Sequence, residues 1–111
     1  STGEECEIEA ERSEFFPDRV VMLKVLHKKG RAGREIILYP VFQFNGLYAV
    51  DVYIYNVDGG EKDMVLEATV VVRLKEVPWL FKMDDLRNRG ACTIVAEAFK
   101  FVEEALCSPT R

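Results

Sequence analysis

The chain has little of what enzymes and metal proteins usually depend on. Its 111 residues include one histidine, His27, and its three cysteines form no C-x-x-C pair. A nucleophilic serine or cysteine needs a base and a third group that orients the base, and a lone histidine beside Lys28 does not supply this arrangement. Paired cysteine and histidine spacings, the usual sign of a zinc site, are also missing. We therefore expect no catalysis, no bound metal and no other cofactor.

Long apolar runs are missing as well. No stretch approaches the roughly 20 apolar residues that a membrane-spanning helix needs. The first five residues are too acidic for a signal or transit peptide, so we expect a cytoplasmic protein with no membrane partner. Apolar residues make up 49% and charged residues 31% of the chain, which is typical of a globular domain. We expect one domain over residues 1–111, with residues 1–4 and 108–111 frayed.

Amide side chains are scarce, with one glutamine and three asparagines beside 13 glutamates and 14 valines. This composition favours a protein from a thermophile, and intracellular disulfides are common in hyperthermophiles. Cys92 and Cys107 lie about 22 Å apart along one predicted helix, too far to pair with each other. Cys6 could pair with either of them, which would leave the third thiol free.

Alternation of apolar and polar residues predicts strands in the first part of the chain. Residues 5–11 alternate three small or apolar side chains with four glutamates, which is typical of an edge strand with one acidic face. Residues 19–27 also alternate and predict a second strand. Between this strand and the next, we expect residues 28–34, with their two glycines, to form a mobile basic loop.

The segment from Glu35 to Asn56 predicts a hairpin with two apolar faces. Asn45-Gly46 is a strong signal for a two-residue turn, because a type I′ turn needs positive φ at both positions. Counting outward from this turn gives a register. One predicted face carries Ile37, Tyr39, Val41, Val50, Val52 and Ile54. The other predicted face carries Ile36 and Leu38 with the aromatic residues Phe42, Phe44, Tyr53 and Tyr55. Both faces need to be covered.

A loop at residues 57–63 leads into another predicted strand at residues 64–77. Beyond it, Asp84 or Asp85 is expected to cap a helix. Apolar residues then recur at helical spacing from residue 91 to residue 106. The sequence therefore predicts an α+β fold: a mostly antiparallel sheet of four or five strands, followed by one long C-terminal amphipathic helix packed on one face. We expect this helix on the aliphatic face, which leaves the aromatic face uncovered.

Other local patterns carry no chemistry by themselves. The acids between Asp58 and Asp63 lack the 12-residue ligand pattern of a calcium loop. The glycines beside Arg31 lack the Lys-Ser/Thr pair of a phosphate-binding loop and precede a strand. Asp51 has no second acid placed near it, so we expect a cross-strand or a cation partner for it.

The charges are distributed unevenly along the chain. Residues 1–18 carry a net charge of −6, residues 19–34 carry +6 and residues 35–111 carry −4. A dedicated binder of duplex DNA is usually basic throughout, so this balance disfavours that class. The cationic segment leads directly into the aromatic hairpin, and we expect its cations at or near the edge of the aromatic face.

Exposed aromatic rings beside a basic strand and loop are typical of single-stranded nucleic-acid binding. Bases stack on such rings at about 1–3 kcal/mol each, while lysine and arginine bind the phosphates. We therefore predict a non-catalytic domain that binds single-stranded nucleic acid, DNA more than RNA. The predicted binding residues are Lys24, Lys28, Lys29, Arg31, Arg34, Phe42, Phe44, Tyr53 and Tyr55, with Trp79 and Phe81 as secondary candidates.

The alternative interpretation is a protein interface. Aromatic residues in strands are buried more often than they bind bases, so the four rings would form a homodimer interface or one half of a second core. The basic segment would then neutralise the acidic N-terminal strand. The two interpretations are compatible, because two paired sheets can form one groove. The expected partners are single-stranded nucleic acid and a second copy of the chain.

Overall fold

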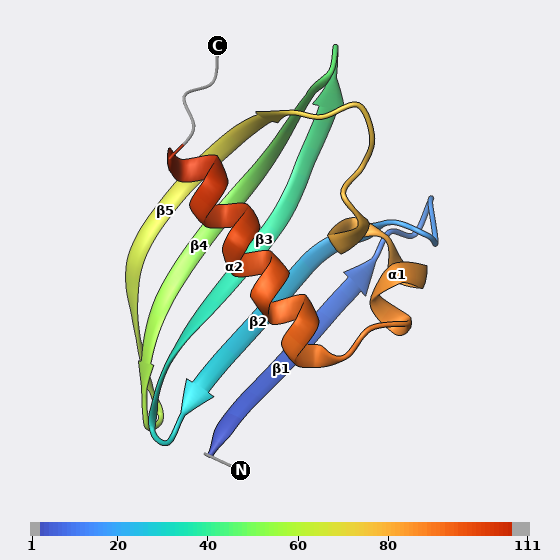
Figure 1. The fold of residues 1–111 in the computed structure, drawn as a ribbon. Helices are drawn as coiled ribbons and strands as arrows, with labels where there is room; N and C mark the ends of the chain where they lie inside the picture. The colour runs from blue at the N-terminus through green and yellow to red at the C-terminus, as the bar shows by residue number, and fades with distance from the viewer. Residues whose placement is uncertain (1–2, 108–111) are drawn as a thin grey trace.

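The computed structural model describes residues 3–107 and consists of a five-stranded antiparallel sheet crossed by one long helix (Figure 1). The strands lie side by side in the order of the chain. They are β1 (Glu4–Arg12), β2 (Val20–Lys29), β3 (Ala32–Phe44), β4 (Leu47–Asp58) and β5 (Glu61–Arg73). After the sheet come a 3-10 helix, η1 (Trp79–Phe81), and the helices α1 (Met83–Arg87) and α2 (Ala91–Cys107). The predicted α+β fold is confirmed.

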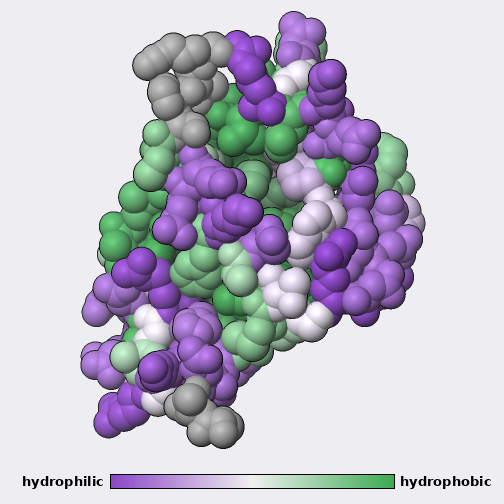
Figure 2. Space-filling model, viewed as in Figure 1, coloured by the Kyte–Doolittle hydropathy of each residue, from purple (hydrophilic) through white to green (hydrophobic). Residues whose placement is uncertain are grey.

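The core lies between the sheet and α2. Apolar residues three or four positions apart on α2 form one stripe, which packs on the strands. The buried helix residues are Ile94, Val95, Ala98, Val102 and Ala105, and the strand residues with no more than 1% exposure are Leu23, Val25, Ile36, Leu38, Val50 and Val52. At one end of this core, the rings of Phe81 and Tyr48 stack with centroids 5.8 Å apart. On the surface of this side, polar side chains cover much of the area, with apolar atoms visible between them (Figure 2).

The β3–β4 hairpin has the predicted turn but only part of the predicted register. Asn45 and Gly46 both have positive φ, at 53° and 77°, and Phe42 pairs with Ala49 as predicted. Further from the turn, the predicted register is wrong by one residue, because β3 has a bulge between Pro40 and Phe42. Proline has no N–H to donate to a neighbouring strand, and in sheets it is found at such irregularities.

The bulge exchanges residues between the two faces of the sheet. Ile36 and Leu38, which we predicted beside the aromatic residues, are buried on the helix side. Ile37 and Tyr39, which we predicted beneath the helix, lie on the opposite face. Val41, at the bulge, is exposed rather than covered by the helix. The four predicted aromatic residues keep their common face, because they lie on the turn side of the bulge or on β4.

The connections between strands are shorter than predicted. The expected mobile loop at residues 28–34 is a two-residue turn at Gly30 and Arg31, and the expected loop at residues 57–63 is a two-residue turn at Gly59 and Gly60. Gly30 and Gly59 have positive φ, which glycine adopts without steric cost and which makes such tight turns possible. Lys28, Lys29 and Arg34 therefore belong to strands and Arg31 to a turn. None of them lies in a loop that could close over a ligand.

The helical segments differ from the prediction at η1, which was not predicted, and at α1. Asp84 and Asp85 lie in its first turn, and the capping position is Lys82, which makes no side-chain capping hydrogen bond. The predicted long helix is confirmed as α2. Most residues that we expected to fray, namely 1–2 and 108–111, lie outside the described part of the chain. Glu4 was included in that expectation, but it is the first residue of β1 and pairs with Lys29 of β2.

A disulfide between Cys6 and Cys92 joins β1 to the first turn of α2, with the two Cα atoms 5.1 Å apart. Of the two pairings that the sequence left open for Cys6, this one is present, and Cys107 is free and exposed. The bond spans 86 positions of sequence and fixes one end of the helix to the edge of the sheet. It therefore restricts almost the whole described chain.

We expect replacement of Cys6 and Cys92 by serine to lower the free energy of unfolding by roughly 2–5 kcal/mol, because a long closed loop restricts the unfolded chain. Urea unfolding of the Cys6→Ser/Cys92→Ser protein measures this loss. Cys107→Ser is the matched control and should leave the midpoint unchanged. Equal stability of the double variant and the control would show that the crosslink contributes nothing.

Candidate functional site: the outer face of the sheet

The face of the sheet opposite α2, called the outer face below, has a centre made of uncharged side chains. Residues two apart on a strand share a face, which brings Ile37 and Tyr39 of β3 beside Tyr53 and Tyr55 of β4. These four residues and Asp51 line an open hollow of about 470 Å³. The rings of Tyr39 and Tyr53 meet edge to face, with centroids 5.8 Å apart and an interplanar angle of 86°.

Two phenylalanines extend this aromatic surface to the β3–β4 turn. Phe42 and Phe44 are 57% and 66% exposed, so neither ring is covered by the chain itself. Exposed apolar side chains that gather on one surface mark interaction sites far more often than isolated ones do. The expectation that the helix would leave the four aromatic residues uncovered on one face agrees with these positions.

Ile37, Tyr39, Tyr53 and Tyr55 are called the tyrosine centre below. An ion pair lies at its margin. Lys62 Nζ donates a hydrogen bond of 2.8 Å to Glu35 Oε1, and the same ammonium lies 5.2 Å from the centroid of the Tyr55 ring. Glu35 is only 6% exposed, and Lys62 is its partner. The hydrogen bond to Glu35, together with the negative charge of its carboxylate, raises the pKa of Lys62. The lysine is therefore charged at neutral pH.

The remaining polar groups at the centre are also paired or neutral. Thr69 Oγ1 donates a hydrogen bond of 2.6 Å to Asp51 Oδ1 across the β4–β5 pair, so of the two partners expected for Asp51, a cross-strand residue or a cation, the cross-strand one is present. The pKa of Tyr53 is raised, first by desolvation and then by the negative charges of Glu67 and Asp51. Tyr53 therefore stays uncharged at neutral pH.

The outer face as a whole is more acidic than basic. Two of its glutamates on β1 lie directly opposite cations on β2, with Glu5 paired to Lys28 and Glu9 to Lys24, and the Glu9–Lys24 ion pair measures 3.5 Å. By strand register, the described strands place seven carboxylates on this face: Glu5, Glu7, Glu9, Glu11, Glu35, Asp51 and Glu67. They place four cations there: Lys24, Lys28, Lys62 and Arg73.

The predicted nucleic-acid-binding residues do not all share one surface. The four aromatic residues lie on the outer face together with Lys24 and Lys28. Lys29 and Arg34 lie on the helix side, where they line a hollow with Phe99 of α2. Arg31 lies in the β2–β3 turn, beside Gly59. Alternation along β2 and β3 continues up to the tight turn, and it divides the basic residues between the two faces.

The secondary candidates lie in the segment that closes the core. Phe81 is 1% exposed and packs between Tyr48 and Phe101, so its ring is not available to a ligand. Trp79 is partly buried, and the guanidinium of Arg89 lies 4.0 Å from its ring centroid. Sequence reasoning missed Tyr39, Ile37 and the Glu35–Lys62 pair as parts of the outer face. Pro40 was the available signal, because a proline inside a strand pattern indicates a bulge.

Comparisons of the chain with protein-family models, with curated proteins and with solved structures find no match. Within residues 3–107, no group of three or more histidine, cysteine, aspartate or glutamate side chains is placed to hold a metal ion. No helix in this range combines the length and the apolar character needed to cross a membrane.

We expect Lys62→Met to lower the free energy of unfolding by about 1–3 kcal/mol at pH 7, because it leaves the buried Glu35 carboxylate without its partner. Glu35→Gln in the same background should recover much of the loss, since a neutral amide costs less to bury. Chemical unfolding of the two single variants and the double variant measures the coupling free energy between Lys62 and Glu35. If the effects of the two substitutions simply added, the pair would contribute no such coupling.

The same pair makes the effect of Lys62→Met depend on pH. The pKa of Lys62 is raised in the folded protein, so the stability it contributes is fully present below the ordinary pKa of lysine. That contribution is lost as the pH rises through the raised value. We therefore expect the stability difference between the wild-type protein and Lys62→Met to be constant around pH 7 and to shrink only in strongly alkaline solution.

Proposed function

We propose that this protein is a non-catalytic assembly module that forms a homodimer by packing the outer faces of two sheets together. The observation that carries the proposal is the uncovered tyrosine centre of the outer face, formed by Ile37, Tyr39, Tyr53 and Tyr55 and bordered by charges of both signs. Protein interfaces combine a centre rich in tyrosine and poor in charge with a polar rim. Two antiparallel sheets can pack face to face at about 10 Å separation.

The distribution of charge favours one arrangement of the two copies. A two-fold axis that lies between the sheets and across the strands would place β1 of one copy on β1 of the other, so that Glu7 and Glu9 would face their own equivalents. Like charges in that position repel. An axis parallel to the strands places β1 opposite β5, which carries Lys62. This second arrangement brings the central strand β3, with Tyr39, close to the axis in both copies.

The dimensions of the molecule are sufficient for a stable interface. It extends 42 × 30 Å in its two longest directions. A standard interface buries roughly 800 Å² on each partner, which a face of this size can provide. The exposed Phe42 and Phe44 would lie at one end of the contact and add apolar area to it.

Single-stranded nucleic acid is the second candidate ligand of the same face. The observation that favours it is the row of exposed or partly exposed rings from Phe44 to Tyr55, on which bases could stack. The excess of carboxylates on the outer face weighs against it, because binding of a strand gains most of its affinity from phosphate contacts. Lys24 is in addition already paired with Glu9.

We expect the molecular mass of the protein in solution to be about twice the 12.7 kDa of one chain. Tyr39→Glu should weaken the dimer by about 100-fold or more, because each copy would bring an unpaired carboxylate into the desolvated centre. Analytical ultracentrifugation over a range of concentrations measures this change. Ala96→Glu adds the same charge at an exposed position of α2 and should leave the dimer intact.

A titration of labelled single-stranded oligonucleotide separates the two candidates. A monomeric wild-type protein would contradict the assembly proposal. If that monomer also bound the strand, with a log–log salt slope of about −0.7 for each neutralised phosphate, nucleic acid would be the ligand of the outer face. Thermal unfolding of Tyr39→Glu shows whether the variant is folded, and Tyr39→Ser offers a milder change at the same position.

A further inference from the structure

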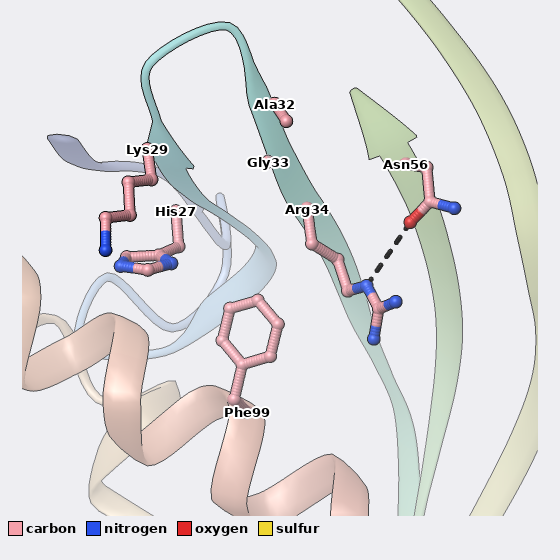
Figure 3. Close-up of a pocket in the computed structure, with 7 residues that line it drawn as sticks. All are labelled: His27, Lys29, Ala32, Gly33, Arg34, Asn56 and Phe99. Carbon is pink, nitrogen blue, oxygen red and sulfur yellow. Dashed lines mark hydrogen bonds between the residues drawn. The ribbon is translucent and has the colours of Figure 1, made fainter. Parts of the chain in front are cut away.

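A second hollow, of about 580 Å³, opens on the helix side of the molecule near the β2–β3 turn (Figure 3). It lies on the opposite side of the sheet from the outer face, so an inference about it does not rest on the proposed dimer. Its walls come from three strands and from α2. The lining residues are His27, Lys29, Ala32, Gly33, Arg34, Asn56 and Phe99.

The polar side chains of this hollow are cations, an imidazole and an amide, and none of the lining residues is acidic. Arg34 Nε donates a hydrogen bond of 3.4 Å to Asn56 Oδ1, which holds the guanidinium from one edge. Its two terminal nitrogens extend away from that contact (Figure 3). A guanidinium can donate two parallel hydrogen bonds to a phosphate or a carboxylate.

Lys29 supplies a second cation from the neighbouring strand, on the far side of the hollow from Arg34 (Figure 3). Between them in the chain, Ala32 and Gly33 have no side chain large enough to fill the space. Acids adjoin the hollow on the same side of the sheet: by strand register Glu4 lies opposite Lys29, Asp58 opposite Ala32 and Asp63 opposite Asn56. Glu4 Oε2 is also 3.5 Å from His27 Nε2. Lys29 and Arg34 are the two cations among the residues that line the hollow, and a phosphate is an anion that both side chains can bind.

Phe99 supplies an apolar surface in the same hollow. Its side chain leaves α2 and points toward the sheet, with its ring between the imidazole of His27 and the guanidinium of Arg34 (Figure 3). The ring is partly buried, which leaves part of it accessible. A flat aromatic group stacks favourably on such a ring. Two cations and one ring together fit a ligand that carries both a phosphate and a planar base.

We propose that this hollow binds a nucleotide, with the phosphate held by Lys29 and Arg34 and the base stacked on Phe99. The amide nitrogen of Asn56 is available to donate to the same ligand, because the oxygen of this side chain already accepts from Arg34. The volume exceeds that of a phosphate ion, so the phosphate alone would leave the aromatic wall unused. Binding involves no covalent step.

Isothermal titration calorimetry with AMP, inorganic phosphate and adenosine tests each part of the proposal. We expect AMP to bind with a dissociation constant of about 1 mM or tighter, and both phosphate and adenosine to bind at least tenfold more weakly. Arg34→Ala and Lys29→Ala should each reduce AMP binding by about tenfold or more. Lys24→Ala removes a cation from the outer face and is the matched control, which should bind AMP like the wild-type protein.

The contribution of the ring needs a variant that keeps the helix packed on the sheet. Phe99→Leu preserves apolar volume and removes the stacking surface, so it should weaken AMP binding without changing the weak binding of phosphate. Equal affinities for AMP and phosphate would overturn the nucleotide assignment, and so would unaltered AMP binding by Arg34→Ala. If an oligonucleotide bound more than tenfold tighter than AMP, the nucleotide assignment would be overturned and the ligand of this hollow would be a nucleic-acid strand.

The oligomeric state of these variants separates this proposal from the proposed function. Arg34 and Lys29 lie outside the outer face, so their alanine variants should sediment like the wild-type protein. Loss of AMP binding in a variant that keeps its oligomeric state supports the nucleotide site. Absence of AMP binding by the wild-type protein overturns this inference and leaves the assembly module untouched.

Discussion

The structure depends on the contact between one amphipathic helix and a sheet that has two apolar faces. The apolar stripe of α2, including Ile94, Ala98 and Val102, removes one face from water and creates the core. Burial of this kind stabilises by about 25 cal/mol for each Å² of apolar surface. Nothing in the described chain does the same for the tyrosines on the opposite face. The described residues form one long helix, so one apolar face of the sheet stays uncovered. This uncovered face is the candidate functional site.

Charge acts as a second constraint, because it determines which ligands each face can accept. On the outer face, Glu5 and Glu9 of β1 lie opposite Lys28 and Lys24 of β2, so these two cations of residues 19–34 are each opposed by a carboxylate. On the helix side, Lys29 and Arg34 line a hollow whose lining residues include no acid, and Glu4 lies opposite Lys29 in the strand register. The same segment of sequence thus divides its cations between an outer face with an excess of carboxylates and a hollow on the helix side.

The general architecture could be predicted from the sequence, since short-range patterns determine it. Alternation gives the strands, Asn45-Gly46 gives the central hairpin, and helical spacing gives α2. The composition of each face could not be predicted in full, because one bulge beside Pro40 moves Tyr39 and Ile37 to the outer face. The pairing of Lys62 with Glu35 and the Cys6–Cys92 bond join residues distant in sequence, and no local pattern indicates them.

The order of elements also determines how the protein emerges from the ribosome. Each strand pairs with its predecessor in the chain, and three of the four connections are turns of two residues, so hairpins can form soon after synthesis. The helix that covers the sheet follows all five strands. Until it has been made, both apolar faces are open to water and to other nascent chains, which is a state prone to aggregation. Cys6 is synthesised 86 residues before Cys92. The disulfide can therefore form only after all five strands have been synthesised.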